Sequence, residues 1–505
     1  MSEHSTGHTR VDPVAEDMDP ALSLTAGPTV LQSPPSTRSA ANKVRCDACP
    51  VLCHISEGRT GACDRWGNVN GLLTRVDPLL LSQHPSASGT DGAIFLTAVG
   101  SGTTYPDYKP APFIVSSRHD DVDIVTVVTE GIFSYCSFKL KIDTDRFLGP
   151  EQANVRFNAE IVGHVTTAEY GSQMLSIGGV HHLTGGGKRE GRATCELMAA
   201  LGNKQAVDLM IDGGCALTVQ SGAPPIVNGV RETRMRVGCG SATIGIFAKQ
   251  WLGLLDEVVV VDDHITGVLT EHQAGKYLNI RASGIELKGR RSTPGRYFKV
   301  ANPGTGWGGT DIEDPTSIIA GFDPEVSWPG MRLLMVSTTG EHSAYFVLDD
   351  QRVPQPVDMP AGVRAAVDLI AENCEPALTT VLFVGGAGGS LRAGATRSPV
   401  RLTQAIRDSR VNVTCGGAPV YVWPGGGITV MVDVATMPDR CFGTVPTPAV
   451  VAPIEFTMKL ADYRALGGYM ESIQPLDDVL NRHRERIVRI ESTNPWPVSH
   501  KALQE

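Results

Sequence analysis

The sequence predicts a mixed α+β (α/β) protein that is rich in glycine, with a strand-rich core and a small N-terminal module in which cysteines bind a metal. The chain of 505 residues is 41% hydrophobic, which suffices to bury a large core and favours two or three domains. Its 55 glycines and 33 prolines imply many tight connections and few long helices. A compact run of cysteines near the N-terminus predicts the metal module.

The composition divides the chain into five segments. Residues 1–43 are rich in Ser, Thr, Pro and Asp and lack apolar periodicity, so they are predicted to form a disordered tail. Residues 44–84 are predicted to form a four-cysteine metal module that has little room for an apolar core and needs its metal for stability. A first α/β domain is predicted over 85–295, a second over 296–470, and a C-terminal helix over 471–505.

Apolar runs and periodicity predict the regular elements. Short β-branched runs bounded by Gly, Asp or Pro predict strands at Val207–Ile211, Glu257–Val261, Leu333–Ser337, Thr380–Val384 and Ile428–Val434. An apolar stripe at helical spacing predicts helices at Arg192–Leu201, Gly362–Glu372, Val400–Arg407 and Leu476–Ile490.

Charge and cysteine usage exclude several classes of function. A net charge of −10 without a basic stripe excludes nucleic acid as a partner. No apolar stretch approaches the roughly 20 residues of a membrane span, so no membrane association is predicted. Seven of the eleven cysteines are scattered singly, which is unsuited to a disulfide framework and indicates a reducing cytoplasm. A homo-oligomer is compatible with these features.

Four cysteines form a complete ligand set: Cys46, Cys49, Cys53 and Cys63. Three of the thiols lie within eight positions, and the fourth follows ten residues later after a turn that contains glycine. Thiolates are soft ligands, and four of them on a loop bind either tetrahedral zinc or the corners of an iron–sulfur cluster. The spacing therefore predicts a metal centre without choosing between the two.

A glycine-rich turn supplies a candidate anion site. The apolar run Val381–Val384 leads into Gly385–Gly389, and Arg392 follows. Backbone amides at Gly388 and Gly389, together with the Arg392 guanidinium, are suited to binding a substrate carboxylate or a flavin phosphate. The alternative is a plain tight turn, because Leu391 stands where the dinucleotide fingerprint requires a small residue.

A second polar cluster follows the strand Glu257–Val261. His264 and Glu271 come after its end, and the carboxyl edge of a strand is a common place for catalysis. Because histidine donates protons near neutral pH, these two residues are the candidate catalytic acids, unless His264 is a satisfied surface or core group. The pair His181–His182 would point to opposite sides of a strand and is not assigned to a metal.

From Cys46 to about Gly468 the chain resembles the 6-hydroxynicotinate reductase family. The resemblance is carried by the cysteine run and by the segments Val165–Ser172, Gly238–Thr243, Asp263–Gly267, Gly304–Thr310 and Trp423–Thr429. It implies ferredoxin-dependent reduction of 6-hydroxynicotinate, a small aromatic acid, to 1,4,5,6-tetrahydro-6-oxonicotinate in nicotinate degradation.

The resemblance also implies cofactors and a partner. A low-potential 4Fe-4S cluster on the four cysteines is favoured over zinc, with a ferredoxin-like protein as electron donor and flavin as a further cofactor. The chain departs from the family's association with more than one cluster, because it has a single complete set of clustered thiols. Two alternatives stay open: a zinc-containing ring-opening hydrolase or hydratase of a related N-heterocycle, and a non-catalytic cluster-bearing subunit of a redox complex.

Overall fold

The computed structural model describes residues 43–47, 52–62, 66–75, 79–85, 91–97, 110–119, 121–144, 146–167, 172–235, 238–262, 266–288, 306–310, 312–387, 389–424, 428–439, 441–445, 448–484 and 487–490. By its contacts the chain separates into Met1–Asn42 and Lys43–Glu505, and all described residues belong to the second unit. None of the helices within these ranges combines the length and apolarity that a membrane crossing requires. The predicted tail, residues 1–43, falls outside the described residues except for Lys43.

Short strands form the N-terminal region. Two antiparallel hairpins consist of β1 (Lys43–Arg45) with β2 (His54–Ser56) and β3 (Trp66–Val69) with β4 (Leu72–Arg75). The buried amide of Asn68 joins them, because its Nδ2 donates to Ile55 O at 3.0 Å. A separate three-stranded sheet contains β5 (Leu79–Pro85) between β6 (Asp91–Thr97) and β31 (Ile487–Ile490).

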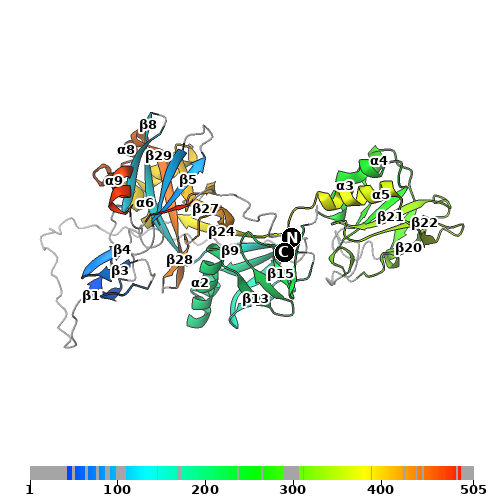
Figure 1. The fold of residues 1–505 in the computed structure, drawn as a ribbon, viewed down its shortest axis with the longest axis horizontal. Coiled ribbons are helices and arrows are strands. Elements are labelled where there is room, and N and C mark those ends of the chain that lie inside the picture. The colour runs from blue at the N-terminus through cyan, green and yellow to red at the C-terminus, as the bar shows by residue number, and fades with distance from the viewer. Residues whose placement is uncertain are drawn as a thin grey trace, which may run out of the picture. The chain divides into compact units, whose positions relative to one another are not determined.

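One 17-stranded mixed sheet forms most of the described chain (Figure 1). Its earlier strands are β7 (Phe113–His119), β8 (Val122–Phe133), β9 (Ser137–Asp143), β10 (Asn154–Phe157), β11 (Glu160–Thr167), β12 (Ser172–Gly178), β13 (Val207–Ile211), β14 (Ala216–Val219), β15 (Ile226–Val227) and β16 (Val230–Arg231). Its later strands are β24 (Thr379–Ala387), β25 (Val411–Cys415), β26 (Ala418–Pro424), β27 (Ile428–Asp433), β28 (Gly443–Val445), β29 (Ala449–Lys459) and β30 (Ile473–Pro475).

One of the places where the two groups of strands meet is the antiparallel pair of β9 and β24, in which Phe138 lies opposite Phe383. Both rings are fully buried and pack edge to face with each other and with Phe442, at centroid distances of 5.3–5.6 Å. Such contacts favour one register over a slipped one. The helices packed with this sheet are α1 (Val180–Leu183), α2 (Lys188–Gly202), α6 (Gly389–Ala395), α7 (Pro399–Arg407), α8 (Leu460–Ala465) and α9 (Leu476–Arg482), with 3₁₀ turns η3 (Val434–Thr436) and η4 (Met470–Ser472).

A five-stranded sheet is built from the chain between β16 and β24. It contains β17 (Glu257–Val261), β18 (Gly267–Val268), β21 (Arg332–Ser337), β22 (Ser343–Leu348) and β23 (Pro354–Pro356), and β17 pairs in parallel with β21. The helices of this segment are α3 (Gly240–Trp251), α4 (Gln273–Tyr277) and α5 (Ala361–Glu372), with 3₁₀ turns η1 (Trp307–Gly309) and η2 (Pro315–Ile318) and the strand pair β19 (Ile285–Leu287) and β20 (Ile319–Phe322).

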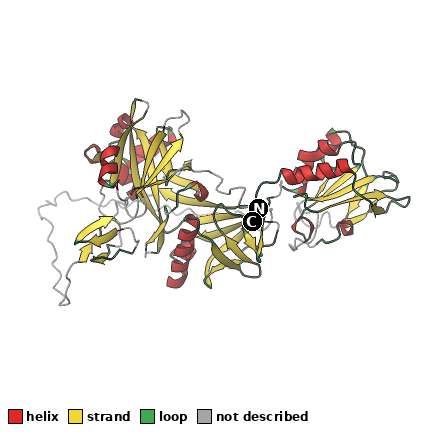
Figure 2. Ribbon diagram, viewed as in Figure 1, coloured by secondary structure: helices red, strands yellow, loops and turns green. Residues whose placement is uncertain are grey.

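Both faces of β17 are buried, which explains its unbroken valine run. Val258 and Val260 pack among residues of α3 and α5. Val259 and Val261 belong to a second cluster of buried residues, which includes Ile285. Figure 2 shows the helices of this segment gathered along the strands. A strand that is covered on both sides has a continuous apolar run because neither set of alternate side chains faces water.

The fold class predicted from the sequence is confirmed as a mixed, strand-rich α/β structure. The five predicted strands and three of the predicted helices are present, with ends shifted by a few residues at most. The fourth helix is shorter than predicted: α9 ends at Arg482, and Ile487–Ile490 form β31 instead. The physical reason is that the apolar residues of this last stretch complete a sheet with β5. The sequence predicts a domain boundary between residues 295 and 296. In the structure β17 precedes this position and β21 follows it, and the two strands are neighbours in one sheet.

Candidate functional site

A polar pocket lies beyond the carboxyl ends of the parallel strands β17 and β21. Its volume of about 160 Å³ resembles that of the roughly 150 Å³ cavity that accepts benzene, so it fits a ligand with a single ring. The lining residues come from four separate stretches of the chain: Arg146; Arg231, Glu232, Thr233 and Arg234; Gly306, Gly308 and Gly309; and Thr339, Glu341 and His342.

Close backbone contacts build one wall of this pocket. Gly308 has a φ of 59° and lies on the end of β17, where an added Cβ would stand 2.4 Å from the carbonyl oxygen of Val261. Only glycine accepts both the conformation and the approach. Asp262, which follows Val261 in the chain, is fully buried and accepts a hydrogen bond of 2.9 Å from Gly240 N at the start of α3. The motifs at 238–243 and 304–310 therefore meet at the end of β17.

The turn after β21 supplies another part of the lining. Ser337 Oγ lies 3.2 Å from Thr339 Oγ1 and accepts a hydrogen bond of 3.1 Å from His342 N. The His342 ring lies beside Trp307, with ring centroids 5.6 Å apart. These contacts place the His342 imidazole at the pocket.

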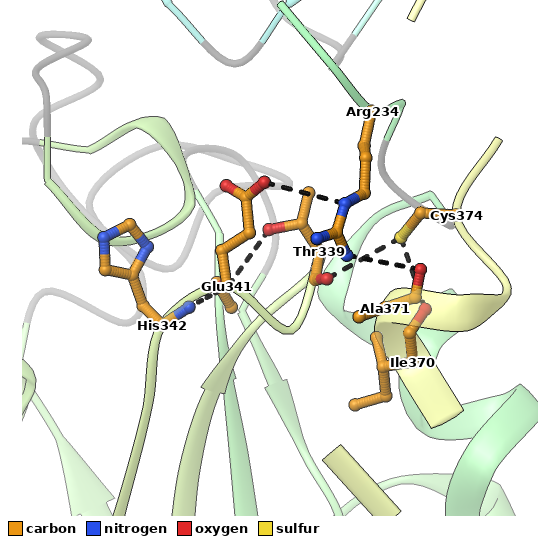
Figure 3. A network of polar contacts seen from close by, with 8 residues as sticks. Arg234, Thr339, Glu341, His342, Ile370, Ala371 and Cys374 are labelled. Carbon is orange, nitrogen blue, oxygen red and sulfur yellow. Dashed lines mark hydrogen bonds and ion pairs between the residues drawn. The ribbon is translucent and has the colours of Figure 1, made fainter. Parts of the chain in front are cut away.

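Arg234 contacts both Glu341 of the pocket lining and Ala371 of α5 (Figure 3). Its backbone bridges to Pro376, so the two chain segments that connect the sheets lie side by side. Its guanidinium donates to Ala371 O at 3.3 Å and lies 3.9 Å from the carboxylate of Glu341. The side chain is about two-fifths exposed, which leaves part of its donor capacity to a ligand.

Arg146 supplies a second guanidinium. Its Nε lies 3.0 Å from Glu232 Oε1, yet the angle between them is not that of a hydrogen bond, and this buried Nε has no hydrogen-bond partner within the described chain. Arg146 and Glu232 thus form an ion pair, and Glu232 Oε1 accepts its hydrogen bond of 2.8 Å from Thr144 Oγ1. A buried donor without a partner is costly, so an anion that accepts from it would be favoured.

The charges of the lining select for an anion. The lining contains three arginines and two glutamates, so its net charge is one positive charge when His342 is neutral. Arginine presents a planar fork that matches a carboxylate. The pocket is therefore suited to a small ring that carries one carboxylate.

The catalytic residues predicted from the sequence are not among the described residues that line the pocket. His264 falls outside the described residues, two positions after Asp262. Glu271 lies half-buried in the turn before α4. Its neighbour His272 caps α4, since its Nδ1 accepts from Ala274 N at 3.0 Å, and burial lowers its pKa. Both catalytic assignments stay predictions.

The predicted anion site lies elsewhere in the fold. Gly388 falls outside the described residues, and Gly389 begins α6. Arg392 is half-buried on α6, and its Nη1 donates to Thr403 Oγ1 at 2.7 Å. Its Nε is buried and has no hydrogen-bond partner within the described chain. Arg392 thus keeps an unused donor and stays a predicted anion ligand.

Two of the four clustered cysteines are described, and they lie at neighbouring positions. Cys46 N donates to Cys53 O at 2.8 Å, which closes the connection that contains Cys49. Gly61 lies against Cys53, and its N donates to Trp66 O at 2.7 Å, which closes the connection that contains Cys63. Cys49 and Cys63 themselves fall outside the described residues. Both connections thus start beside Cys53, which fits a single site with four sulfur ligands.

Few features of the sequence indicate that these arginines line a pocket. Arg146, Arg231 and Arg234 stand in separate, otherwise ordinary stretches, and His342 has no neighbouring motif. The one available signal is the glycine run at 304–310, whose density marks close backbone approach without revealing what it approaches.

The chain is similar along most of its length to one characterised protein. It is 41% identical over 438 residues to a protein described as "6-hydroxynicotinate reductase" from Eubacterium barkeri, and the match covers 86% of this chain and 87% of that protein. No protein-family model matches the chain. No solved structure matches it either.

Proposed function

Because this chain belongs to the 6-hydroxynicotinate reductase family, we propose that it reduces 6-hydroxynicotinate to 1,4,5,6-tetrahydro-6-oxonicotinate. The similarity over 86% of the chain carries this proposal. The conversion adds a pair of electrons and two protons to one ring double bond and leaves the carboxylate unchanged. The protein must therefore bind a single-ring anion, supply protons and receive low-potential electrons.

The arginine-lined pocket supports the first requirement. Its volume suits one ring, and Arg146, whose Nε makes no hydrogen bond within the described chain, together with Arg234 offers donors to the carboxylate. We propose this pocket as the substrate site, with Arg392, Gly388 and Gly389 as the alternative anion site. Losing one charge-assisted contact costs about 1.5–3 kcal/mol, which is roughly a tenfold to hundredfold loss of affinity.

For proton supply we propose His264 and Glu271. Asp262 lies directly beneath Gly308 in the pocket wall, and His264 follows it by two residues. Histidine is suited to protonating a reduced ring near neutral pH. His342, which lines the pocket beside Trp307, is the competing donor from within the described chain.

For electron supply we propose a 4Fe-4S cluster on Cys46, Cys49, Cys53 and Cys63, reduced by a ferredoxin-like donor. Such a cluster accepts and passes on single electrons at low potential. In the described part of the module, two backbone hydrogen bonds support this proposal: Cys46 N donates to Cys53 O, and Gly61 N, which lies against Cys53, donates to Trp66 O. Flavin is proposed as a second cofactor, since it joins one-electron supply to two-electron reduction.

The proposal is tested on protein purified without oxygen. We expect iron and sulfide in cluster proportion, visible absorption that bleaches on reduction, and consumption of 6-hydroxynicotinate with reduced ferredoxin. A colourless zinc protein that opens the ring would establish the hydrolase or hydratase instead. A cluster without turnover would indicate a subunit of a larger redox complex.

A pair of variants locates the substrate carboxylate. Arg146→Ala should raise KM for 6-hydroxynicotinate by roughly tenfold to a hundredfold and should leave the affinity for 2-hydroxypyridine, which lacks the carboxylate, unchanged. Arg392→Ala is the matched variant at the alternative site. If only Arg392→Ala discriminates between the two substrates, the arginine-lined pocket is not the substrate site.

A further inference from the structure

A cluster of two histidines and one glutamate lies apart from both the cysteine module and the arginine-lined pocket. His181 and His182 stand on the short helix α1, and Glu190 stands in the first turn of α2. One donor atom from each residue lies within 4.8 Å of the other two. We propose that these three residues bind a divalent transition metal of the zinc class, with water completing the coordination.

The helical turn α1 brings the side chains of His181 and His182 together, whereas a strand would point them to opposite sides. Adjacent positions predicted side chains on opposite sides of a strand, and that premise is wrong because both histidines lie on one helical turn. Their ring centroids are 4.9 Å apart, at an interplanar angle of 77°. One nitrogen of each imidazole lies within 4.8 Å of the other and of a Glu190 carboxylate oxygen.

The donor set and its spacing suit zinc. Zinc binds imidazole nitrogen and carboxylate oxygen at about 2.0–2.2 Å, and sites with three protein ligands keep an open position for water. Ligands on one tetrahedral ion stand roughly 3.4 Å apart. His182 Nδ1 and Glu190 Oε1 lie 2.7 Å apart, and the other donor pairs are within 4.8 Å. Small side-chain rotations therefore bring all three to ligand distance.

The position of Glu190 depends on a glycine. Its carboxylate lies over Gly186, where an added Cβ would stand 2.5–2.7 Å from the carboxylate atoms. Gly191 lets the first turn of α2 approach α1, since a Cβ there would stand 3.0 Å from Leu183 O. The two helices are thus held at the separation that brings the three donors together.

The exposure of the ligands agrees with an ion at the surface. His182 is buried, Glu190 is one-fifth exposed and His181 is exposed. The two inner ligands are consequently preorganised, while the outer imidazole can close over an arriving ion. One carboxylate and two neutral imidazoles leave an excess of positive charge on the bound ion, which favours coordination of water or an anion at the open position.

Zinc titration of the full chain tests the site. Protein with its iron intact is treated with a chelator and titrated with Zn²⁺ by calorimetry, with iron measured before and after to detect exchange into the cysteine module. We expect one zinc per chain in addition to the iron. His181→Ala and Glu190→Gln should each weaken binding by at least about a hundredfold.

Two further variants separate ligation from folding. Gly186→Ala leaves every donor in place but occupies the space of the Glu190 carboxylate, so it should also weaken zinc binding. Glu196→Gln makes the same charge change on α2, at a residue paired with Arg192, and should bind zinc like the unmodified protein. Equal zinc binding by His181→Ala and the unmodified protein would overturn the proposal, as would absence of any zinc beyond that held by the cysteine module.

Discussion

The cysteine module and the arginine-lined pocket are built in opposite ways. The module draws its four thiols from 18 consecutive positions, Cys46–Cys63, and its described part buries few apolar side chains besides Ile55. The pocket draws its lining from four distant stretches that are held by the packed sheets. In the module the ligand is expected to hold the fold, whereas in the pocket the fold holds the ligand site.

This difference has a practical consequence for mutagenesis. Replacing a ligand in the module removes the interaction that organises it, so function and local structure should be lost together. Replacing a side chain that lines the pocket leaves the buried strands beneath it intact, so binding should change without unfolding. Perturbations of each region should therefore be separable in the same molecule.

The largest effect is expected from Cys49→Ser. Three remaining thiolates hold a cluster poorly, so bound iron should fall to near zero and reductase activity by roughly a hundredfold or more. Binding of 6-hydroxynicotinate, measured by calorimetry, should persist because the pocket does not depend on the module. Cys374→Ser, which changes a thiol near the pocket, serves as the control and should retain its iron. Full iron content in Cys49→Ser would contradict the assignment of the iron to this module.

A pH series should move the stability of the large sheet and the metal content of the module in opposite directions. Burial raises the pKa of Glu455, on β29 of the large sheet, to about 7. Its carboxyl is thus protonated in the folded chain between about pH 4.5 and 7, where the unfolded chain is ionised. Stability from this group is complete below about pH 4.5 and is lost as the pH rises through about 7, by about 3 kcal/mol. The module should instead lose metal as the pH falls, because its thiolates become protonated.

Calorimetric unfolding and iron retention, each measured from about pH 5 to 8, check these two trends. Glu455→Gln keeps an acceptor for Thr414 and Gly417 and removes the titration, so the slope in unfolding should disappear. The same slope in the variant would assign the pH dependence to another group.

Two glycine substitutions compare the backbones of the regions directly. Gly308→Ala in the pocket forces a Cβ against Val261 O, in addition to the cost of a positive φ, and should destabilise the chain by about 2–3 kcal/mol and abolish substrate binding. Gly58→Ala in the module has a similar φ of 70° but open space around it, so it should cost only about 1 kcal/mol. Thermal unfolding of both variants measures the difference, and equal shifts would contradict the close-approach argument.

The smallest effect is expected from deleting residues 1–40. Their composition lacks the apolar content needed to pack against either region. Iron content, substrate affinity and unfolding temperature should all match those of the full chain. Aggregation or loss of iron in the shortened protein would show that this segment supports the module.

The sequence by itself determined the features that depend on neighbouring residues. Periodicity located β17 and α5 almost to the residue, because an apolar run or stripe is a local pattern. Thiol spacing predicted the metal module from a pattern that is equally local. The resemblance carried by short motifs identified the family that the similarity over 86% of the chain establishes.

The tertiary structure alone decided which distant residues meet. It brought Arg146, Arg234 and His342 to one pocket, and it placed the last apolar stretch beside β5 rather than in a helix. It also turned His181 and His182 toward Glu190. The pocket and the pairing of β31 with β5 depend on segments that lie far apart in the chain. The position of the two histidines depends on α1 being a helical turn. Local propensity contains no information about a partner strand, so these contacts were fixed only when the sheets assembled.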